Sequence, residues 1–311
     1  MARCFITRRL PGDAVTRLTT AGHEVDVWPE PLPPAPNQLK QRASAAEGLL
    51  CLLTDRIDAE LLDASPSLKV IANYAVGCDN VDLAATAARN IPVGVTPDVL
   101  TEATADLTWA LILAAARRLP EAQQAVKQGA WRTWEPAGWL GLELNNATLG
   151  IVGRGRIGGA VARRAQGFGM TIISTGSRDD PTALDQLLAQ ADVVTLHCPL
   201  TPATRYLIDA SALDRMKRTA ILVNTARGAI VDPGALKTAL RSDAIAGAAL
   251  DVTEPEPLPA DHPLLQSPNL LVTPHIGSAT HTARERMADL AVDNLLAGLA
   301  GEPLPHPAPD S

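Results

Sequence analysis

The chain has 311 residues, which suits two domains, because a domain usually holds about 100 to 200 residues. Its 27 Lys and Arg face 34 Asp and Glu, without a dense basic tract, so we expect no nucleic-acid partner. The four cysteines are dispersed and fit no ligand spacing, which predicts reduced thiols in a cytoplasmic protein and no metal site. The longest apolar stretch, 107–116, is too short to span a membrane, which takes about 20 residues.

Short apolar runs alternate with helical patterns in the first 97 residues. The predicted strands are 4–7, 24–28, 48–54, 68–73 and 92–95. Strands that alternate with helices predict a parallel sheet. The Pro-rich segment 29–36 predicts a surface loop, because proline lacks the amide donor that a central strand needs.

A second alternation begins near Thr148, after a helical pattern over 98–119 and an irregular segment that contains Trp131, Trp134 and Trp139. The predicted strands are 149–152, 171–174, 193–197, 220–225, 246–252 and 270–273. Six such strands predict a doubly wound Rossmann sheet. A last helical pattern, 280–299, is expected to return to the N-terminal domain. We therefore predict a dinucleotide-binding domain of residues 98–283, a substrate domain of residues 1–97 plus 284–311, and a ligand cleft between them.

A glycine loop joins the predicted strand 149–152 to a helical pattern. The loop reads Gly153, Arg154, Gly155, Arg156, Ile157, Gly158. In this setting the first glycine permits a tight turn, the second lets the backbone approach a pyrophosphate, and the third lets the helix pack on the strand. The helix N-terminus attracts the phosphates, and the two arginines add positive charge. The loop predicts dinucleotide binding.

The end of the second strand indicates which dinucleotide is preferred. An NAD site places an acid about 20 residues beyond the glycine loop, where it binds the ribose 2′-hydroxyl. Ser177 and Arg178 stand there in this chain, which favours the 2′-phosphate of NADP(H). NAD(H) stays possible, because Asp179 and Asp180 follow directly.

Three chemically active side chains follow buried strands of the second half: Arg227, Glu256 and His275. Parallel strands end at one edge of a sheet, and open α/β sheets bind ligands at this carboxyl edge. A cation, a carboxylate and an imidazole gathered there predict proton and hydride chemistry.

The segments 196–201, 224–228, 251–257 and 273–280 resemble the D-isomer-specific 2-hydroxyacid dehydrogenases. Within that family, 74–80, 103–107 and 275–280 are most similar to the glyoxylate and hydroxypyruvate reductases. The resemblance covers nearly the whole chain. It implies an α/β fold in which a Rossmann doubly wound parallel sheet is inserted into a flavodoxin-like substrate domain.

The resemblance also implies roles for the trio. Arg227 orients the carboxylate and carbonyl of a 2-oxo acid, a task that suits a planar fork of donors. His275 protonates the carbonyl oxygen while hydride reaches the carbon, and it accepts the proton in the reverse direction. Glu256 favours the charged imidazole and orients it.

Further binding residues come from the same resemblance. Val76 and Gly77 belong to a loop whose backbone amides receive the substrate carboxylate, and Ser278 lies near the substrate. Trp139 reaches a neighbouring subunit's site or anchors the dimer contact. The resemblance places these residues along the cofactor, together with the glycine loop, Ser177, Arg178, Arg227 and His275: Thr104, Cys198, Pro199, Thr225, Ala226, Asp251 and Gly277.

We therefore expect a cytoplasmic, homodimeric NAD(P)H-dependent reductase that converts glyoxylate and hydroxypyruvate to D-2-hydroxy acids. Two alternatives remain open at this point. A phosphoglycerate dehydrogenase would share the trio. A dinucleotide-sensing scaffold, similar to the corepressors of this fold, would keep the trio without depending on turnover.

Overall fold

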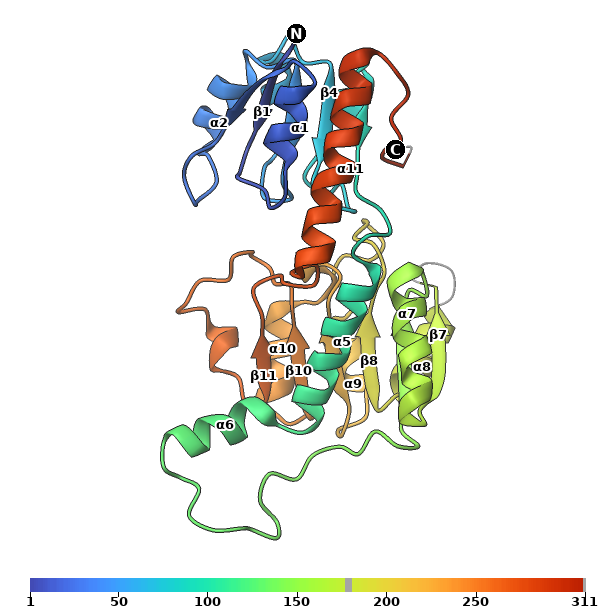
Figure 1. Ribbon diagram of the computed structural model, residues 1–311. Helices are drawn as coiled ribbons and strands as arrows, with labels where there is room; N and C mark the ends of the chain where they lie inside the picture. Colours follow the sequence, from blue (N-terminus) through green and yellow to red (C-terminus); the bar gives the residue numbers. More distant parts are fainter. Residues whose placement is uncertain (177–180, 310–311) are drawn as a thin grey trace. The chain divides into compact units, whose positions relative to one another are not determined.

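A computed structural model describes residues 1–176 and 181–309 and divides the chain into two compact units. Unit 1 comprises Met1–Leu100 and Ala279–Ser311, and unit 2 comprises Thr101–Ser278. Each unit is built on a parallel sheet with helices on both faces (Figure 1). The predicted α/β fold with two parallel-sheet domains is confirmed.

Unit 1 contains a five-stranded parallel sheet in the order β2-β1-β3-β4-β5. The strands are β1 (Arg3–Ile6), β2 (Glu24–Val27), β3 (Gly48–Cys51), β4 (Val70–Asn73) and β5 (Val93–Gly94). This is the flavodoxin-like order, in which the chain changes direction between β1 and β3. Ligands of such sheets bind at the carboxyl edge near that point.

Helices cover both faces of the first sheet. They are α1 (Ala14–Thr20) and α11 (His281–Ala300) on one face, and α2 (Pro36–Ala43), α3 (Ala59–Asp63) and α4 (Leu83–Ala87) on the other. Leu49 and Ile71 face the second group, whereas Leu50 and Ala72 face α1 and α11. Alternate side chains of a strand point to opposite faces, so burial on both faces explains the continuous apolar runs.

Unit 2 contains a six-stranded parallel sheet in the order β11-β10-β9-β8-β6-β7. The strands are β6 (Thr148–Val152), β7 (Thr171–Thr175), β8 (Val193–Leu196), β9 (Ile221–Asn224), β10 (Gly247–Leu250) and β11 (Leu270–Val272). The chain runs outward from β6 to β7 and then crosses to β8 on the other side of β6. The switch point lies at the end of β6, where the glycine loop begins.

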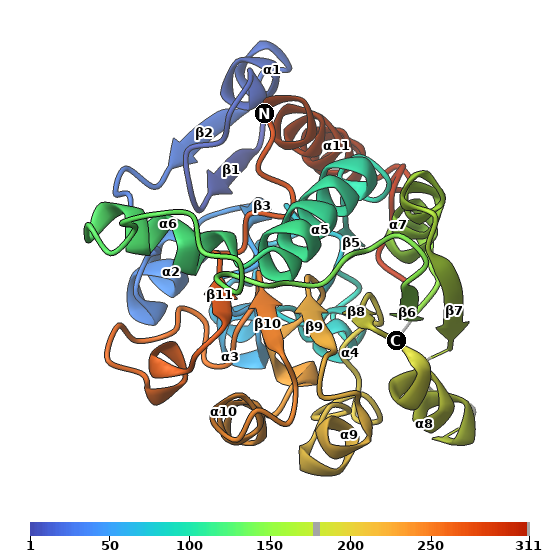
Figure 2. The ribbon, with the colours of Figure 1, turned by 90° about the horizontal axis from the view of Figure 1, so that it is seen from below.

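Two helical layers enclose this sheet, as Figure 2 shows. One layer holds α5 (Thr101–Ala116) and α7 (Arg156–Ala165), and the other holds α8 (Pro181–Gln190), α9 (Ala210–Arg215) and α10 (Pro233–Arg241). Short 3-10 turns occur at η1 (Gln166–Phe168), η2 (Gly228–Ile230) and η3 (Pro263–Gln266).

The helix predicted over 98–119 is shorter, and a second helix, α6 (Leu119–Lys127), follows it. The break falls at Arg118, whose φ of 52° is left-handed, and Pro120 lies in the first turn of α6. A left-handed residue cannot continue a right-handed helix, and proline is tolerated in a helix only near its start.

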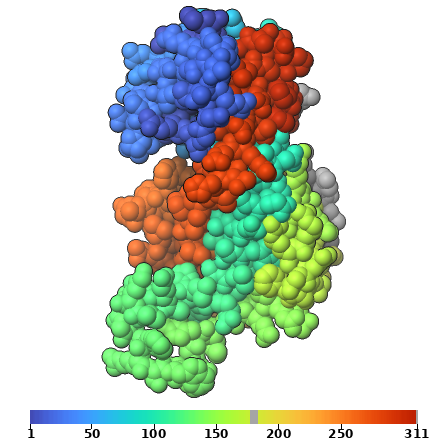
Figure 3. All heavy atoms as spheres, viewed as in Figure 1, coloured from blue at the N-terminus to red at the C-terminus, as the bar shows by residue number. Residues whose placement is uncertain are grey.

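The segment 128–147 lacks helix and strand; its first part projects from the surface of unit 2 (Figure 3), and its end is buried through Leu144 and Ala147. Trp131 and Trp134 in this segment are 65% and 79% exposed. Within the described residues, every helix is too short or too polar to cross a lipid bilayer.

Candidate active site

Two glycines of the loop after β6 are required by the packing of the protein itself. A Cβ on Gly153, whose φ is +90°, would lie 2.6 Å from the backbone nitrogen of Cys198. A Cβ on Gly158 would lie 2.3 Å from the carbonyl oxygen of Gly153. By contrast, a Cβ on Gly155 would meet no atom within 4 Å. Packing within the protein therefore does not require glycine at position 155. A glycine at this position allows a ligand to approach the backbone closely.

The start of α7 completes a site that fits a dinucleotide pyrophosphate. Gly155 is the N-cap of this ten-residue helix, and it offers no side chain to the first-turn amides. Those amides and the helix dipole favour an anion. Arg156 is the first helical residue, exposed Arg154 precedes the cap, and Ile157 packs into the core shared by α5 and α7.

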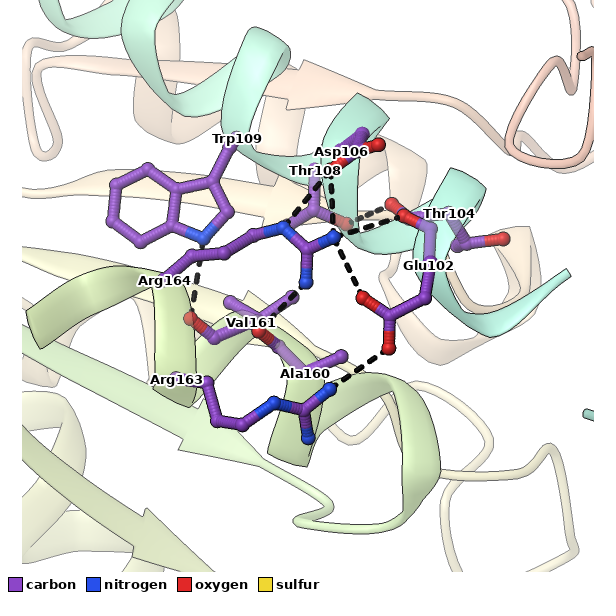
Figure 4. A network of polar contacts seen from close by, with 9 residues as sticks. All are labelled: Glu102, Thr104, Asp106, Thr108, Trp109, Ala160, Val161, Arg163 and Arg164. Carbon is purple, nitrogen blue, oxygen red and sulfur yellow. Dashed lines mark hydrogen bonds and ion pairs between the residues drawn. The ribbon is translucent and has the colours of Figure 1, made fainter. Parts of the chain in front are cut away.

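A polar clamp joins α7 to α5 (Figure 4). Glu102 accepts hydrogen bonds from Arg163 and Arg164 at 2.8 and 2.7 Å, and Arg164 also reaches Asp106 at 2.7 Å. Exposed ion pairs of this kind stabilise a protein little. The buried Trp109 adds a hydrogen bond of 3.1 Å to the carbonyl of Val161. The clamp fixes α5, which carries Thr104, against the helix that begins at the glycine loop.

Thr104 and Thr225, both predicted to line the cofactor, are linked through Thr108. The Thr108 hydroxyl lies 2.8 Å from the carbonyl oxygen of Thr104 and 3.1 Å from the Thr225 hydroxyl. All three residues are buried. The start of α5 and the loop after β9 are therefore held together. The sequence analysis missed Thr108, which occupies an apolar helix with only its threonine hydroxyl as a signal.

Asn224 anchors the loop that carries Arg227, and the sequence analysis did not single it out. Asn224 is the last residue of β9 and is fully buried. Its Oδ1 accepts from the amide of Ala226 at 3.0 Å, and its Nδ2 donates to the carbonyl of Arg227 at 2.9 Å. Buried side-chain amides are normally hydrogen-bonded. An asparagine at the end of an apolar strand is therefore the sequence signal that could have identified Asn224.

The loops after β9 and β10 lie directly against each other. A Cβ on Gly228 would lie 2.0 Å from the carbonyl oxygen of Thr253, so only glycine permits this contact. The amide of Thr253 donates to Oε2 of Glu256 at 3.3 Å. The contact thus brings the loop of Arg227 next to the loop of Glu256.

Asp251 organises the loop that carries His275. This buried carboxylate accepts from the Thr273 hydroxyl at 2.6 Å and from the amides of Ile276 and Gly277 at 2.9 and 2.8 Å. The backbone of Asp251 also accepts from the amide of His275 at 2.8 Å. His275 has a φ of 53°, an uncommon conformation for a residue with a side chain, and these bonds offset its cost.

The imidazole of His275 and the carboxylate of Glu256 form a close pair. Nδ1 of His275 lies 2.5 Å from Oε1 of Glu256. Burial alone would raise the pKa of Glu256, but the hydrogen bond and charge of His275, the Thr253 amide and the charge of Arg227 outweigh burial and lower that pKa. The carboxylate therefore stays charged and engages Nδ1. The Nε2 atom is the ring nitrogen left for proton transfer.

His197 differs from His275 in that burial, and not a carboxylate, controls its pKa. It follows β8, and burial lowers its pKa to about 4, so the ring is neutral at ordinary pH. Its Nε2 lies 3.0 Å from the Thr195 hydroxyl. The next residues, Cys198 and Pro199, were predicted to line the cofactor. The backbone of Cys198 abuts Gly153, whereas Pro199 is exposed.

In unit 1, the loop after β4 carries Val76 and Gly77. Among the described residues, the backbone N–H groups of Val76 and Gly77 donate to no other group. The N–H groups of Tyr74 and Ala75, just before them, donate to the carbonyls of Cys51 and Asn73. Two adjacent backbone N–H groups that follow a strand and donate to no other described group are suited to bind an anion.

The remaining predicted residues are placed less directly. Leu140, the neighbour of Trp139, lines a pocket with Thr219, Ala246 and Asn269, which precede β9, β10 and β11. Leu140 therefore lies near the amino edge of the sheet of unit 2, whereas His275 follows the carboxyl end of β11. Ser278 ends unit 2. Ser177 and Arg178 lie outside the described residues.

Over 1–176 and 181–309, no group of three or more His, Cys, Asp and Glu side chains could hold a metal ion. The chemically active groups around the β9 loop are the guanidinium of Arg227, the carboxylate of Glu256 and the imidazole of His275.

Comparison with known proteins identifies close relatives. A family model for the D-isomer specific 2-hydroxyacid dehydrogenase NAD binding domain matches residues 109–277. A glyoxylate reductase of Korarchaeum cryptofilum is 46% identical over 315 residues, covering 98% of this chain and 95% of that protein. The crystal structure of the TT0316 protein from Thermus thermophilus has a TM-score of 0.93 and 52% identity, covering 99% and 100% of the two chains.

A third relative has been crystallised with ligands. It is an NADPH-dependent glyoxylate/hydroxypyruvate reductase of Sinorhizobium meliloti in complex with NADP and malonate. Its TM-score is 0.84 and its identity is 33%, over 98% of this chain and 96% of that chain.

Proposed function

Because the chain belongs to the D-isomer-specific 2-hydroxyacid dehydrogenases, we propose that it reduces glyoxylate and hydroxypyruvate to D-2-hydroxy acids with NAD(P)H. The family and the reaction class predicted from the sequence are confirmed by the matches to glyoxylate reductases. The observation that carries the proposal is the 2.5 Å pair of His275 and Glu256 in the same unit as the glycine loop.

In the proposed mechanism, His275 donates the proton on Nε2 to the carbonyl oxygen of the 2-oxo acid, while the bound dinucleotide supplies a hydride to the carbonyl carbon. Glu256 accepts a hydrogen bond from Nδ1 and stabilises the imidazolium before transfer. In the oxidative direction the neutral imidazole takes the proton back.

Arg227 orients the substrate by its carboxylate and polarises the carbonyl. The backbone amides of Val76 and Gly77 bind the same carboxylate, which their lack of other described partners supports. Ser278 lies near the substrate in this proposal. The buried Asp251 keeps the loop of His275 in place and faces the nicotinamide carboxamide.

For the cofactor, the glycine loop and α7 hold the pyrophosphate. The other proposed contacts are Thr104, Cys198, Pro199, Thr225, Ala226, Asp251 and Gly277. We propose a preference for NADPH, with NADH accepted more weakly. Supporting this, β7 ends at Thr175 without an acid, Ser177 and Arg178 follow in sequence, and the Sinorhizobium meliloti relative is described as NADPH-dependent.

We further propose a cytoplasmic homodimer. The exposed tryptophans of 128–147 support a contact with a second copy, because large apolar side chains gathered on a surface mark interaction sites. A substrate contact by Trp139 would come from that second copy, since its neighbour Leu140 lies near the amino edge of the sheet and His275 follows the carboxyl end of β11. The four free cysteines support a reducing compartment.

The test is the initial rate of NADPH and of NADH oxidation with glyoxylate, hydroxypyruvate, pyruvate and 3-phosphohydroxypyruvate. We expect the highest kcat/KM with NADPH and glyoxylate or hydroxypyruvate. Preference for 3-phosphohydroxypyruvate would instead indicate a phosphoglycerate dehydrogenase. Dinucleotide binding without turnover of any substrate would contradict the proposal and favour a scaffold.

Substitution of Arg178 by alanine tests the cofactor preference. The Arg178→Ala substitution should weaken the binding of NADPH much more than the binding of NADH, because only NADPH carries the 2′-phosphate. Equal weakening of both dinucleotides would show that Arg178 does not contact this phosphate.

A further inference from the structure

The loop after β4 is held by a buried side chain that the proposed mechanism does not use. We propose that Asn73 is a positioning residue, which keeps the amides of Val76 and Gly77 ready to receive the substrate carboxylate. This inference rests on the proposed function and deepens it, because it identifies what gives the anion-binding loop its shape.

Asn73 is the last residue of β4 and is fully buried. Its Nδ2 donates to the carbonyl oxygen of Gly77 at 2.9 Å and to Oδ1 of Asn80 at 3.2 Å. Its Oδ1 accepts from Sγ of Cys51 at 3.6 Å and from Nδ2 of Asn80 at 3.3 Å. Both ends of the amide are used. The reversed amide would place Oδ1 against the carbonyl oxygen of Gly77, so this orientation is the one the network supports.

Asn80 ties the other end of the loop to the neighbouring strand connection. Its Nδ2 donates to the carbonyls of Leu52 and Asp55 at 3.1 and 3.0 Å, both in the segment after β3. The segment from Asn73 to Asn80 is thus held at its start, at Gly77 and at its end. These anchors lie at the carboxyl ends of β3 and β4.

The bond to Gly77 matters because of where it acts. Glycine has more backbone freedom than any other residue, so an unanchored Gly77 would have to be ordered when the anion binds. The hydrogen bond from Asn73 removes that freedom beforehand. Ordering a binding loop in advance raises affinity without a new contact to the ligand. The backbone amides of Val76 and Gly77 donate no hydrogen bond to another described residue.

The test compares wild type with Asn73→Ala and Asn73→Asp, using Asn294→Ala as the matched control. Asn294 is a fully buried asparagine of the same unit, and it also bridges two backbone groups, the carbonyl of Val95 and the amide of His306. Its contacts lie outside the loop 74–80. The Asp variant keeps the shape of Asn73 but replaces the amide donor that faces Gly77.

The readouts are the KM and kcat for glyoxylate, the Kd of NADPH, and the Kd of oxalate for the protein saturated with NADPH. Losing the anchor should raise the KM and the oxalate Kd about tenfold, the effect of one hydrogen bond, with kcat and the NADPH Kd within about twofold. Asn294→Ala should lower Tm without raising either constant.

Unchanged KM and oxalate Kd in Asn73 variants, or an equal rise in Asn294→Ala, would overturn the inference. If Asn73→Ala does not fold, Asn73→Asp decides the question. Oxalate needs no turnover, so it also tests Asn73 separately from the reaction. Absence of glyoxylate reduction by wild type would refute the proposed function, while the oxalate comparison would still support or overturn the role of Asn73.

Discussion

The loops after β4 and β9 are built in the same way and offer different chemistry. Each begins with a fully buried asparagine, Asn73 or Asn224, that ends its strand and donates to a backbone carbonyl three or four residues later. The first loop then presents backbone amides. The second presents the guanidinium of Arg227 beside Glu256 and His275. In the proposed function, the same backbone arrangement supports anion binding in one unit and proton chemistry in the other.

The buried or half-buried acids near these loops have pKa values shifted in opposite directions. Asp55, beside the β4 loop, has its pKa raised by burial, despite hydrogen bonds from Thr7 and Leu52 and the charge of Arg8. Glu256, beside the β9 loop, has its pKa lowered, because His275 and Arg227 supply positive charge. The opposite directions follow from the surroundings, because burial disfavours the charged carboxylate whereas nearby positive charge favours it.

The largest effect should come from removing the proposed proton donor, His275, which pairs with Glu256 beside the β9 loop. His275→Ala should lower kcat about a thousandfold, within the range expected for loss of a general acid. The Kd of the dinucleotide should change little, as measured by fluorescence titration. His281→Ala, an exposed histidine of α11, is the control and should behave as wild type. Equal loss of turnover and cofactor binding would contradict the role of His275.

Removing the charge of Glu256 should have the next largest effect. Glu256→Gln should lower kcat/KM about 10- to 100-fold, because a hydrogen bond to a charged group is lost. The stabilising contribution of a carboxylate with a lowered pKa is fully present above its unfolded pKa, and it is lost as pH falls through the folded pKa. Tm of wild type should therefore fall more steeply than Tm of Glu256→Gln on acidification.

Glu254→Gln is the control for that experiment, since Glu254 pairs with Arg205 at 2.6 Å and does not contact His275. It should retain wild-type kcat/KM. Parallel acid curves for wild type and Glu256→Gln would show that Glu256 and His275 do not interact as an ion pair in solution.

The β9 anchor should have a smaller effect than the charged pair. Asn224→Ala removes two backbone hydrogen bonds, so kcat/KM should fall about tenfold or more. Unlike Asn73→Ala, Asn224→Ala should also lower the affinity for the dinucleotide, because Thr225 and Ala226 belong to the proposed cofactor site. Calorimetric titration of NADPH against both variants measures this. Identical cofactor affinities would remove the proposed distinction between the loops.

The smallest effect is expected at Asp55. An acid with a raised pKa contributes stability that is fully present below its unfolded pKa and is lost as pH rises through the folded pKa. Asp55→Asn should therefore make Tm fall more steeply than that of wild type on acidification, opposite in sign to Glu256→Gln. Asp63→Asn, an exposed carboxylate, should leave the curve unchanged. A parallel curve for Asp55→Asn would show that Asp55 titrates normally.

Much of the architecture could be predicted from local sequence. Apolar runs located the eleven strands of the described residues, because burial on both faces makes a parallel strand almost uniformly apolar. The glycine loop was recognisable from its position between strand and helix. The helix α6 was not predicted as a separate helix. The turn before it depends on the left-handed backbone of Arg118, a conformation that is uncommon for arginine and has no sequence signal here.

The sequence by itself determined the two parallel sheets, the glycine loop and the candidate trio, because periodicity and motif context are local properties. The tertiary structure alone decided which side chains meet. The pairing of Glu256 with His275 joins residues that follow β10 and β11, and it depends on the packing of Gly228 against Thr253 and on the contacts of Asp251. The anchors at Asn73 and Asn224 likewise depend on how each loop folds back over its strand, which no spacing in the chain expresses.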